Sequence, residues 1–465
     1  MKATYENSAP SKVVTKPESG LGSKLVLLMA LALVLAGGSM IAATLFRSNS
    51  QPVNSSGAMI NDPSAILAAG AGTNVGLADR TIATAQQQIK QIPDDYKAYV
   101  NLGYAFQQKA RETSDPNFYV QAEDALTRAL ALKPNYYDAM AGLGQLNLSR
   151  HDFVTALEWG QKAQALQPAS AYAYGVIGDA QIELGRYDQA VQTFQKMVDL
   201  RPDISSYSRV SYARELYGDV PGAIQAMQQA VNAGAPAQEN TAWGRVQLGN
   251  LYFNSNQLDK AAQAYNEALS NYPNYLHAQA GLAMVNWAQG RDDEAVKLYQ
   301  QSVATVPLPQ YLTSLGDLYN SMGDTANAKK QLDLVTYIYQ VFQAGGVNVD
   351  MEKSAFLADH ATNDNDLKEA VTLAERAAGV RQDVHTMDAL GWVYYKAGRY
   401  QDALQAEQKA VRLGTLNALF YFHLGMIQDK LGDHATAKAN VQKALNINPF
   451  FSIQYMKIAQ DFVRN

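Results

Sequence analysis

The sequence contains no cysteine among its 465 residues. This absence excludes structural disulfides, cysteine-ligated zinc or iron–sulfur centres, thiol catalysis and any lipid anchor attached to cysteine. Proline is scarce, with 15 residues, which suits a helical chain because proline interrupts helices. Charged residues make up only 17% of the chain and apolar residues 47%, so the chain as a whole is not disordered.

Motifs for phosphate binding and hydrolysis are also missing. No GxxxxGK[ST], GxGxxG or GxSxG stretch occurs, and the six histidines are scattered without an HExxH pair. The sequence therefore predicts no catalytic residue, no metal site and no cofactor. The stretch Asn363–Asp366 resembles a calcium loop only superficially, since the loop glycine is absent. We interpret it as a polar turn with a helix cap.

Acidic residues outnumber basic residues beyond the first 46 residues. The net charge is −5, and residues 1–46 hold four lysines and two glutamates, so the remainder carries −7. An acidic remainder is a poor match for a phosphate backbone. Nucleic acid is therefore not expected as a partner.

One long apolar run does occur, at Leu25–Phe46, with 22 residues and no charge. At about 1.5 Å per residue it reaches roughly 33 Å, enough to cross a hydrocarbon core. Four lysines precede it and only Arg47 follows before Arg80, so residues 1–24 are expected to be a short cytoplasmic tail. We expect a retained single-pass transmembrane anchor. The alternative is a cleaved signal peptide with Leu25–Ala36 as its apolar stretch.

Residues 47–78 are rich in Ser, Asn, Gly, Ala and Pro and show little periodicity, which predicts a flexible linker. Beyond them, alanine recurs at intervals of 33 to 42 residues. The recurring alanines are Ala122, Ala156, Ala190, Ala223, Ala261, Ala295, Ala328, Ala370, Ala403 and Ala437. Twelve residues before nine of them lies a small residue, usually ending a pair such as Leu143-Gly144, and proline follows twelve residues later in six repeats. Small residues in two successive helices allow the backbones to approach closely.

A turn residue is expected between the two helices of each repeat. Glycine or asparagine lies seven residues after the small residue in eight repeats, and these residues tolerate the left-handed backbone conformation that ends a helix. They are Gly185, Gly218, Asn256, Gly290, Gly323, Asn365, Gly398 and Gly432. Spacing, small residues and turn residues together predict a repeated helix–turn–helix unit.

This pattern resembles the tetratricopeptide repeat (TPR) family over about residues 96–449, in ten units. The resemblance implies an all-α, right-handed α-solenoid over residues 79–465, preceded here by the single transmembrane helix. Leu77–Ile92 is expected to be a leading half-unit and Phe450–Arg464 a trailing helix. Terminal helices of this kind cover the apolar ends of a solenoid.

In TPR proteins the first helix of each repeat lines a concave groove that binds extended peptides or partner helices. Transfer by register predicts a groove that contains Tyr104, Gln145, Asp179, Tyr212, Asn250, Phe253, Met284, Trp287, Asp317, Trp392, Tyr395, Phe422 and Met426. Aromatic and methionine side chains suit a partner site. For Trp287 and Trp392 we favour exposure in the groove, with burial between helices as the alternative. The carboxylate clamp of some TPR proteins is not expected, because Val246, Asn250, Ala280 and Met284 form no basic cluster.

The leading functional hypothesis is a membrane-tethered TPR scaffold that binds protein or peptide partners in its concave groove. It would act outside the cytoplasm, with the array periplasmic or extracellular. The alternative is an assembly factor of an envelope machine, of the polysaccharide-export or cytochrome c maturation type, which rests on architecture alone. An enzyme with an unfamiliar site is the least favoured hypothesis.

Overall fold

The computed structural model describes residues 76–464, and every regular element among them is a helix. Ten helix pairs follow one another, each joined by a short turn. In chain order they are α4 (Tyr96–Thr113) with α5 (Asn117–Leu132), α6 (Tyr137–Ser149) with α7 (Phe153–Leu166), α8 (Ala171–Glu183) with α9 (Tyr187–Leu200), α10 (Ile204–Leu216) with α11 (Val220–Ala233), α12 (Glu239–Asn254) with α13 (Leu258–Asn271), α14 (Leu276–Ala288) with α15 (Asp292–Thr305), α16 (Pro309–Ser321) with α17 (Thr325–Ala344), α18 (Asp350–His360) with α19 (Asp364–Val380), α20 (Val384–Lys396) with α21 (Tyr400–Ala410), and α22 (Ala418–Lys430) with α23 (His434–Ile447).

Two further helices flank the pairs: α3 (Leu77–Gln91) precedes them and α24 (Met456–Arg464) follows them. A short 3-10 helix, η1 (Val411–Leu413), extends α21. The predicted leading half-unit is confirmed as α3. Residues 77 and 78, which the sequence assigned to the linker, belong to α3, and Ala78 is buried in it.

The predicted anchor Leu25–Phe46, the tail 1–24 and most of the linker lie outside the described residues. Within residues 76–464, no helix combines the length and the apolar character that a membrane crossing requires.

The recurring small residues form the contacts within the pairs, as predicted. Each of the ten alanines is at most 1% exposed. A Cβ atom at Gly178 would lie 2.2 Å from Phe194, and one at Gly249 would lie 2.4 Å from Tyr265. The first helix of each of these pairs therefore approaches its partner more closely than any residue with a side chain would allow.

The turns between paired helices follow the sequence prediction in seven of eight places. All six predicted glycines and Asn256 have positive φ angles. Asn365 was predicted wrongly: it lies in the first turn of α19, where the Asn363 side chain accepts the N–H groups of Asn365 and Asp366. His151, which the sequence did not indicate, has φ 58° and ends the α6–α7 turn in the same conformation.

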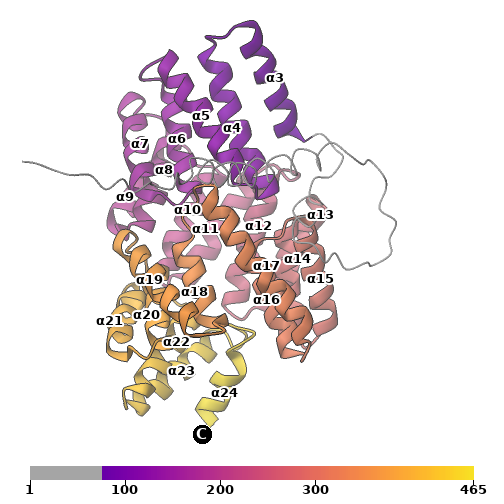
Figure 1. Cartoon of the computed structure of the whole chain (residues 1–465), viewed down its shortest axis with the longest axis vertical. Helices are drawn as coiled ribbons and strands as arrows, with labels where there is room; N and C mark the ends of the chain where they lie inside the picture. The colour runs from indigo at the N-terminus through magenta and orange to yellow at the C-terminus, as the bar shows by residue number, and fades with distance from the viewer. Residues whose placement is uncertain (1–75, 465) are drawn as a thin grey trace, which may run out of the picture. The chain divides into compact units, whose positions relative to one another are not determined.

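Within the described residues, hydrogen bonds join parts of the array that lie 197 to 199 residues apart in the sequence. Val384 N–H donates to the Tyr187 hydroxyl at 2.7 Å, which joins α9 to α20, and Figure 1 shows α9 and α19 on the same side of the molecule. Thr415 Oγ1 donates to the Leu216 carbonyl. Six pairs thus make one turn of the coil, and we name the line of contact between successive turns the seam.

The seam contains apolar packing as well as hydrogen bonds. One core cluster combines Phe194 and Leu216 of the third and fourth pairs with Met387 and Phe420 of the ninth and tenth. The backbones approach closely there, because a Cβ atom at Gly218 would lie 2.6 Å from the Gly414 carbonyl oxygen. The coil is therefore closed along this side, and successive turns share a core.

The end of the chain departs from the prediction. The trailing helix was predicted over Phe450–Arg464, but only Met456–Arg464 is helical, and the residues before it are irregular. Residues 450–464, which we name the C-terminal segment, contact the first helix of every pair from the sixth to the tenth. The segment therefore lies along the groove in addition to covering the last pair.

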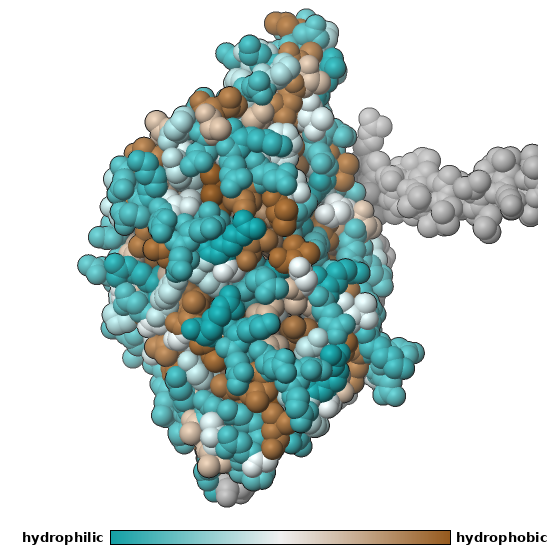
Figure 2. Space-filling view, turned by 90° about the vertical axis from the view of Figure 1, so that its left-hand side faces the viewer, coloured by the Kyte–Doolittle hydropathy of each residue, from teal (hydrophilic) through white to brown (hydrophobic). Residues whose placement is uncertain are grey.

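The side of the molecule that Figure 2 presents is largely hydrophilic, with apolar residues in separate patches between polar ones. Exposed large apolar residues of the array, such as Val154 and Val191, are isolated in the same way along their helices. Single exposed apolar side chains are normal for a protein surface.

Candidate functional site

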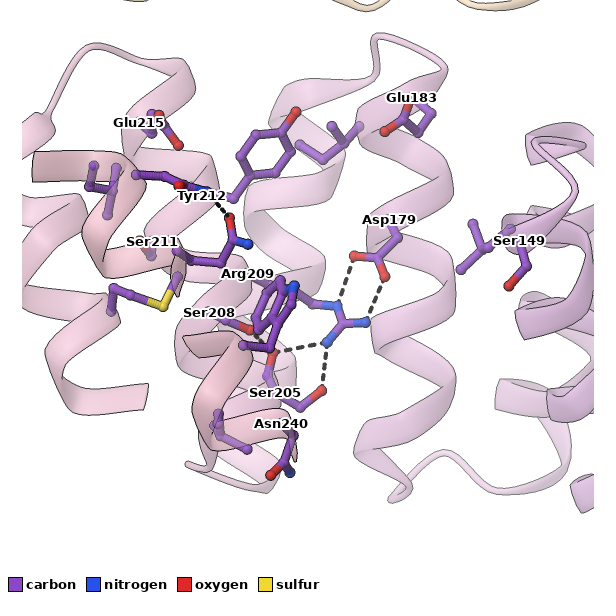
Figure 3. A pocket seen from close by; sticks show the side chains of 18 of the residues that line it. Ser149, Asp179, Glu183, Ser205, Ser208, Arg209, Ser211, Tyr212, Glu215 and Asn240 are labelled. Atoms are coloured by element: carbon purple, nitrogen blue, oxygen red, sulfur yellow. Dashed lines mark hydrogen bonds and ion pairs between the residues drawn. The ribbon is translucent and has the colours of Figure 1, made fainter. Parts of the chain in front are cut away.

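A cavity of about 870 Å³ opens between the first helices of the second to fifth pairs, α6, α8, α10 and α12. Four of the predicted groove residues line it: Gln145, Asp179, Tyr212 and Asn250. The lining also includes seven hydroxyl and amide side chains, some of which Figure 3 shows: Ser149, Ser205, Ser208, Ser211, Asn240, Gln247 and Asn254. We name this space the polar cavity.

An ion pair between neighbouring repeats forms one wall of the polar cavity. Arg209 Nε donates to Asp179 Oδ1 at 2.8 Å and Arg209 Nη2 donates to Asp179 Oδ2 at 2.6 Å. Arg209 Nη1 also donates to Ser205 Oγ at 2.6 Å, as Figure 3 shows. Burial acts to lower the pKa of Arg209, but Asp179 outweighs burial and the pKa is raised. The Arg209 guanidinium therefore stays charged, and its two hydrogen bonds to Asp179 fix the bidentate geometry.

Two carboxyl groups of the cavity titrate close to neutral pH. Burial raises the pKa of Glu215 to about 7. Burial also raises the pKa of Glu183 to about 7, although the nearby Arg381 guanidinium acts in the opposite direction. The net charge of the cavity therefore changes around neutral pH, and a ligand held there would sense that change.

Amide side chains and one exposed tryptophan line the wall formed by α12. The Tyr265 hydroxyl donates to Asn250 Oδ1 at 2.8 Å, which fixes the orientation of that amide. Trp243, on the same helix, is 38% exposed and lines the cavity. An amide can both donate to and accept from a peptide backbone, and an exposed indole provides a large apolar contact.

A second cavity of about 1060 Å³ adjoins the first, since Ser149, His151, Trp243 and Glu352 line both. Its remaining lining is more aromatic, with residues such as Tyr275, His277, Tyr339 and Phe342. His277 Nδ1 lies 2.7 Å from the Tyr311 hydroxyl. Burial lowers the pKa of His277, so this ring is neutral at neutral pH. The two cavities together offer a polar surface followed by an aromatic one.

The C-terminal segment contacts four of the predicted groove residues in the sixth to tenth pairs, namely Trp287, Asp317, Trp392 and Phe422. Phe450 packs edge-on against Trp287 with ring centroids 6.3 Å apart, beside Met284. Tyr455 stacks on Phe422 at 5.2 Å and meets Trp392 edge-on at 5.4 Å.

Polar contacts fix the same segment. Gln454 Nε2 donates to Asp317 Oδ1 at 2.8 Å, and His360 Nε2 lies 2.9 Å from the same oxygen. Burial acts to lower the pKa of His360, but its hydrogen bond to Asp317 and the charge of Asp317 outweigh burial and raise it. The Tyr455 hydroxyl and Trp392 Nε1 both donate to Asp359. The C-terminal segment therefore occupies the groove along the sixth to tenth pairs.

The preference for exposed tryptophans was wrong. Trp287 is 8% exposed and Trp392 is 4% exposed, because the C-terminal segment covers both. Phe253 is buried in the core between α12 and α13, and Phe422 is buried beneath Tyr455. Register selects a face of each first helix but cannot indicate what covers that face.

The remaining predicted residues also make contacts within the chain. The Tyr104 hydroxyl donates to the Asp138 carbonyl at 3.0 Å, between the first and second pairs. Tyr395 stacks on Trp392 at 4.7 Å, and Met426 packs against the same core. Of the thirteen predicted residues, the structure gathers four around the polar cavity.

Sequence reasoning missed Arg209 and Trp243. Arg209 lies one residue before Val210, at a position outside the transferred register. Trp243 lies six residues before Gly249, outside the transferred register, although it lines the cavity.

Sequence reasoning also missed a cluster of three possible metal ligands. Asp388, Glu407 and His423 are all buried, and one donor atom of each lies within 4.8 Å of the other two. The three residues come from three consecutive helices, so no short motif joins them. The sequence did contain one signal for this cluster. Glu407 places a carboxylate at a helix position that is apolar in the other repeats.

Comparison with known families gives matches to models described as tetratricopeptide repeat. The matched residues are 117–171, 171–204, 246–308, 309–341, 384–414 and 418–451, which together span more than half of the chain.

Relatives of known name are similar to parts of the chain. Anaphase-promoting complex subunit 7 of Arabidopsis thaliana is 26% identical over 153 residues, which is 33% of this chain and 27% of that protein. Cellulose synthase operon protein C of Pseudomonas fluorescens (strain SBW25) is 25% identical over 190 residues, which is 41% of this chain and 13% of that protein. The chain thus spans little more than a quarter, at most, of these two relatives.

Among solved structures, a thermophilic TPR protein of Thermus thermophilus, TTC0263, is 23% identical. It covers 41% of this chain and 99% of its own, with a TM-score of 0.37.

Proposed function

Because the chain belongs to the tetratricopeptide-repeat family, we propose that it is a scaffold for protein interactions whose polar cavity binds an extended polypeptide segment. TPR proteins bind protein or peptide partners, and this cavity is the part of the groove that the chain's own C-terminal segment leaves uncovered. The observation that carries the proposal is the lining of the cavity from four successive repeats by amides, hydroxyls and one fixed ion pair.

The lining chemistry favours a segment bound through its backbone. Gln145, Asn240, Gln247, Asn250 and Asn254 provide side-chain amides along α6 and α12. Such groups pair with peptide N–H and C=O groups whatever the ligand's side chains are. Spreading the contacts over several repeats also yields affinity from weak individual interactions.

The cavity charges indicate the ligand class more narrowly. Asp179 is matched by Arg209, whereas Glu215 has no basic partner among the described residues. The ionised form of Glu215 would repel an acidic segment. It would not repel a neutral or weakly basic segment. We therefore propose that the ligand is an extended segment of neutral to weakly basic character with an apolar side chain placed against Trp243.

Photo-crosslinking in living cells tests this proposal. A photoreactive amino acid at position 243 is expected to capture a polypeptide, identified by mass spectrometry, because that side chain lines the cavity. Position 337 is the matched control, since Tyr337 is also 38% exposed but lines neither cavity. Trp243→Ala is expected to weaken binding of the captured segment by about 30-fold, as at other aromatic hot spots. Equal capture at both positions, or none at either, would contradict the proposal.

We further propose that Leu25–Phe46 tethers the array to a membrane, with residues 1–24 in the cytoplasm and the array beyond it. The support is the uncharged length of the run and the lysines that precede it. The cysteine-free sequence makes the test direct, because one introduced cysteine is the only thiol. Ser50→Cys is expected to react with a membrane-impermeant maleimide on intact cells and Ser8→Cys is not. The reverse pattern would contradict the orientation.

An alternative function is assembly of an envelope machine of the polysaccharide-export type. The similarity to cellulose synthase operon protein C favours it over the cytochrome c maturation type, although the chain spans 13% of that protein. The same crosslink distinguishes the two functions, because a machine component would be captured repeatedly and as one defined protein. Both proposals are non-catalytic, in keeping with TPR folds, which are typically scaffolds.

A further inference from the structure

The tenfold repeat provides an internal comparison for every position of the unit. The residue four places after the recurring alanine packs against the small residue of the first helix, as Phe194 does against Gly178. In nine repeats this residue is uncharged: Leu126, Gly160, Phe194, Met227, Tyr265, Tyr299, Leu332, Ala374 and Val441. In the ninth repeat it is Glu407, which keeps the same packing, since a Cβ atom at Gly391 would lie 2.7 Å from Glu407 Oε2.

Asp388 is a second exception of the same kind. Three places before the small residue, the other nine repeats have only uncharged residues: Val100, Ala141, Gly175, Ser208, Val246, Ala280, Thr313, Ala355 and Phe422. Asp388 takes this position in the same repeat as Glu407. Two carboxylates therefore replace two uncharged residues at one point of the array, and they face each other from α20 and α21.

The burial of these groups demands a compensating charge. Glu407 is fully buried and neither of its carboxylate oxygens has a hydrogen-bond partner. Asp388 is 7% exposed, and its ion-pair partner among the described residues is His423. An uncompensated pair of buried carboxylates is strongly unfavourable.

His423 completes the cluster from the next helix, α22. Its Nδ1 lies 2.8 Å from Asp388 Oδ1, and its Nε2 has no partner although the ring is 3% exposed. The Trp392 ring stacks on it with centroids 3.9 Å apart and planes 12° apart. Three potential ligands from three successive helices thus converge in the core, with unpaired donor atoms on two of them.

We propose that Asp388, Glu407 and His423 bind one divalent metal ion of the zinc class. Carboxylate oxygens and an imidazole nitrogen are ligands that zinc accepts, at bond lengths of about 2.0–2.2 Å. A double positive charge balances two ionised carboxylates beside a neutral imidazole. Closure around the ion requires small side-chain movements, because the donor atoms already lie within 4.8 Å of one another. The ion would join the ninth and tenth pairs, next to the core that holds the C-terminal segment.

Metal analysis of the full chain tests the site directly. The protein is purified in detergent, stripped with a chelator, and given Zn²⁺ alone. One zinc ion per chain is expected to remain after gel filtration, and the midpoint of thermal unfolding is expected to rise with zinc. Addition of Ni²⁺ instead is expected to quench tryptophan fluorescence, because Trp392 stacks on the ligand His423.

Two variants separate a metal site from a structural role. Glu407→Leu should fold, because Leu126 takes the equivalent position in the first repeat, but it should bind zinc at least about 10-fold more weakly. His434→Ala is the control, since His434 Nδ1 also lies 2.8 Å from a carboxylate, Asp429, but its side chain is 75% exposed. This variant should retain zinc and the nickel quenching.

Two outcomes would overturn the proposal. If the wild type and Glu407→Leu retain equal zinc, the signal is an adventitious ion only. If the wild type retains none and Glu407→Leu is the more stable protein, the two carboxyl groups share a proton in place of a metal ion.

Discussion

Arg381 forms an ion pair with Glu183, which lies 198 residues earlier in the chain. The Arg381 side chain is 9% exposed and also lies 3.4 Å from carboxylate oxygens of Glu352 and Asp383. It neutralises acidic groups contributed by both turns of the coil, so the seam has a charged centre as well as an apolar one.

Arg381→Ala is expected to destabilise the protein by about 3–5 kcal/mol, because buried carboxylates lose their counter-charge. Urea unfolding measures the change. Arg399→Ala is the control: Arg399 pairs with Glu375 and Asp402, but its side chain is 42% exposed, so the loss should be about 0–1 kcal/mol. Similar losses of unfolding free energy in both variants would show that the Arg381 ion pair stabilises the protein no more than an exposed ion pair does.

Tyr187→Phe should loosen the seam without changing the shape of the core. The variant removes the hydroxyl that accepts the Val384 N–H, and Val384 is fully buried, so the unpaired group should cost about 1–3 kcal/mol. Hydrogen exchange at the Val384 amide should accelerate. Tyr217→Phe loses a comparable bond to Asp188 at an exposed position and should leave that amide unchanged.

Gly178→Ala tests the close packing within one pair. The new Cβ would lie 2.2 Å from Phe194, so overpacking should cost about 1–3 kcal/mol. Gly379→Ala, near the end of α19, meets no atom within 4 Å and should be neutral or stabilise by up to about 1 kcal/mol. Thermal denaturation of the two variants decides whether space or helix propensity governs these positions.

His360 should make the stability depend on pH. Its pKa is raised in the folded protein, since Asp317 outweighs the opposing effect of burial, so the folded state binds the proton more tightly than the unfolded state. The stabilisation is therefore complete below the unfolded pKa of about 6.5 and is lost as the pH rises through the folded pKa. The difference in unfolding free energy between wild type and His360→Asn should shrink as the pH rises above about 6.5. A constant difference would contradict the assignment.

The double change Phe450→Ala with Tyr455→Ala should release the C-terminal segment. Trp287 and Trp392 would lose the rings that cover them, so tryptophan emission should shift to the red. Ile458→Ala, at a residue of α24 that is 46% exposed, should leave the spectrum unchanged. An unshifted spectrum in the double variant would mean that other contacts suffice to hold the segment.

The repeat architecture could be predicted because its causes are local. Small residues, turn glycines and prolines act within a single unit of about 34 residues, so Ala190 and Gly185 could be placed from spacing alone. The same spacing could not reveal that Val384 meets Tyr187, because that contact depends on the pitch of the whole coil. A small rotation per repeat, summed over six repeats, decides whether the turns touch.

The candidate site was predictable to the same limited degree. Register selected Asp179 and Tyr212, which line the polar cavity, because each lies on the face of a first helix that borders it. Trp392 occupies that face too, but a segment near the end of the chain covers it, and no periodic signal specifies where that segment goes. Glu407 was discoverable from the sequence, since a comparison of equivalent positions in the ten repeats identifies it as the charged exception.

The seam changes how this array would respond to a pulling force. An open solenoid stretches like a spring and loses its units one at a time, because each unit contacts only its neighbours. Here the third and fourth pairs are also fastened to the ninth and tenth, so extension must first break buried bonds that lie far apart in the sequence. The coil is therefore expected to be stiff along its axis.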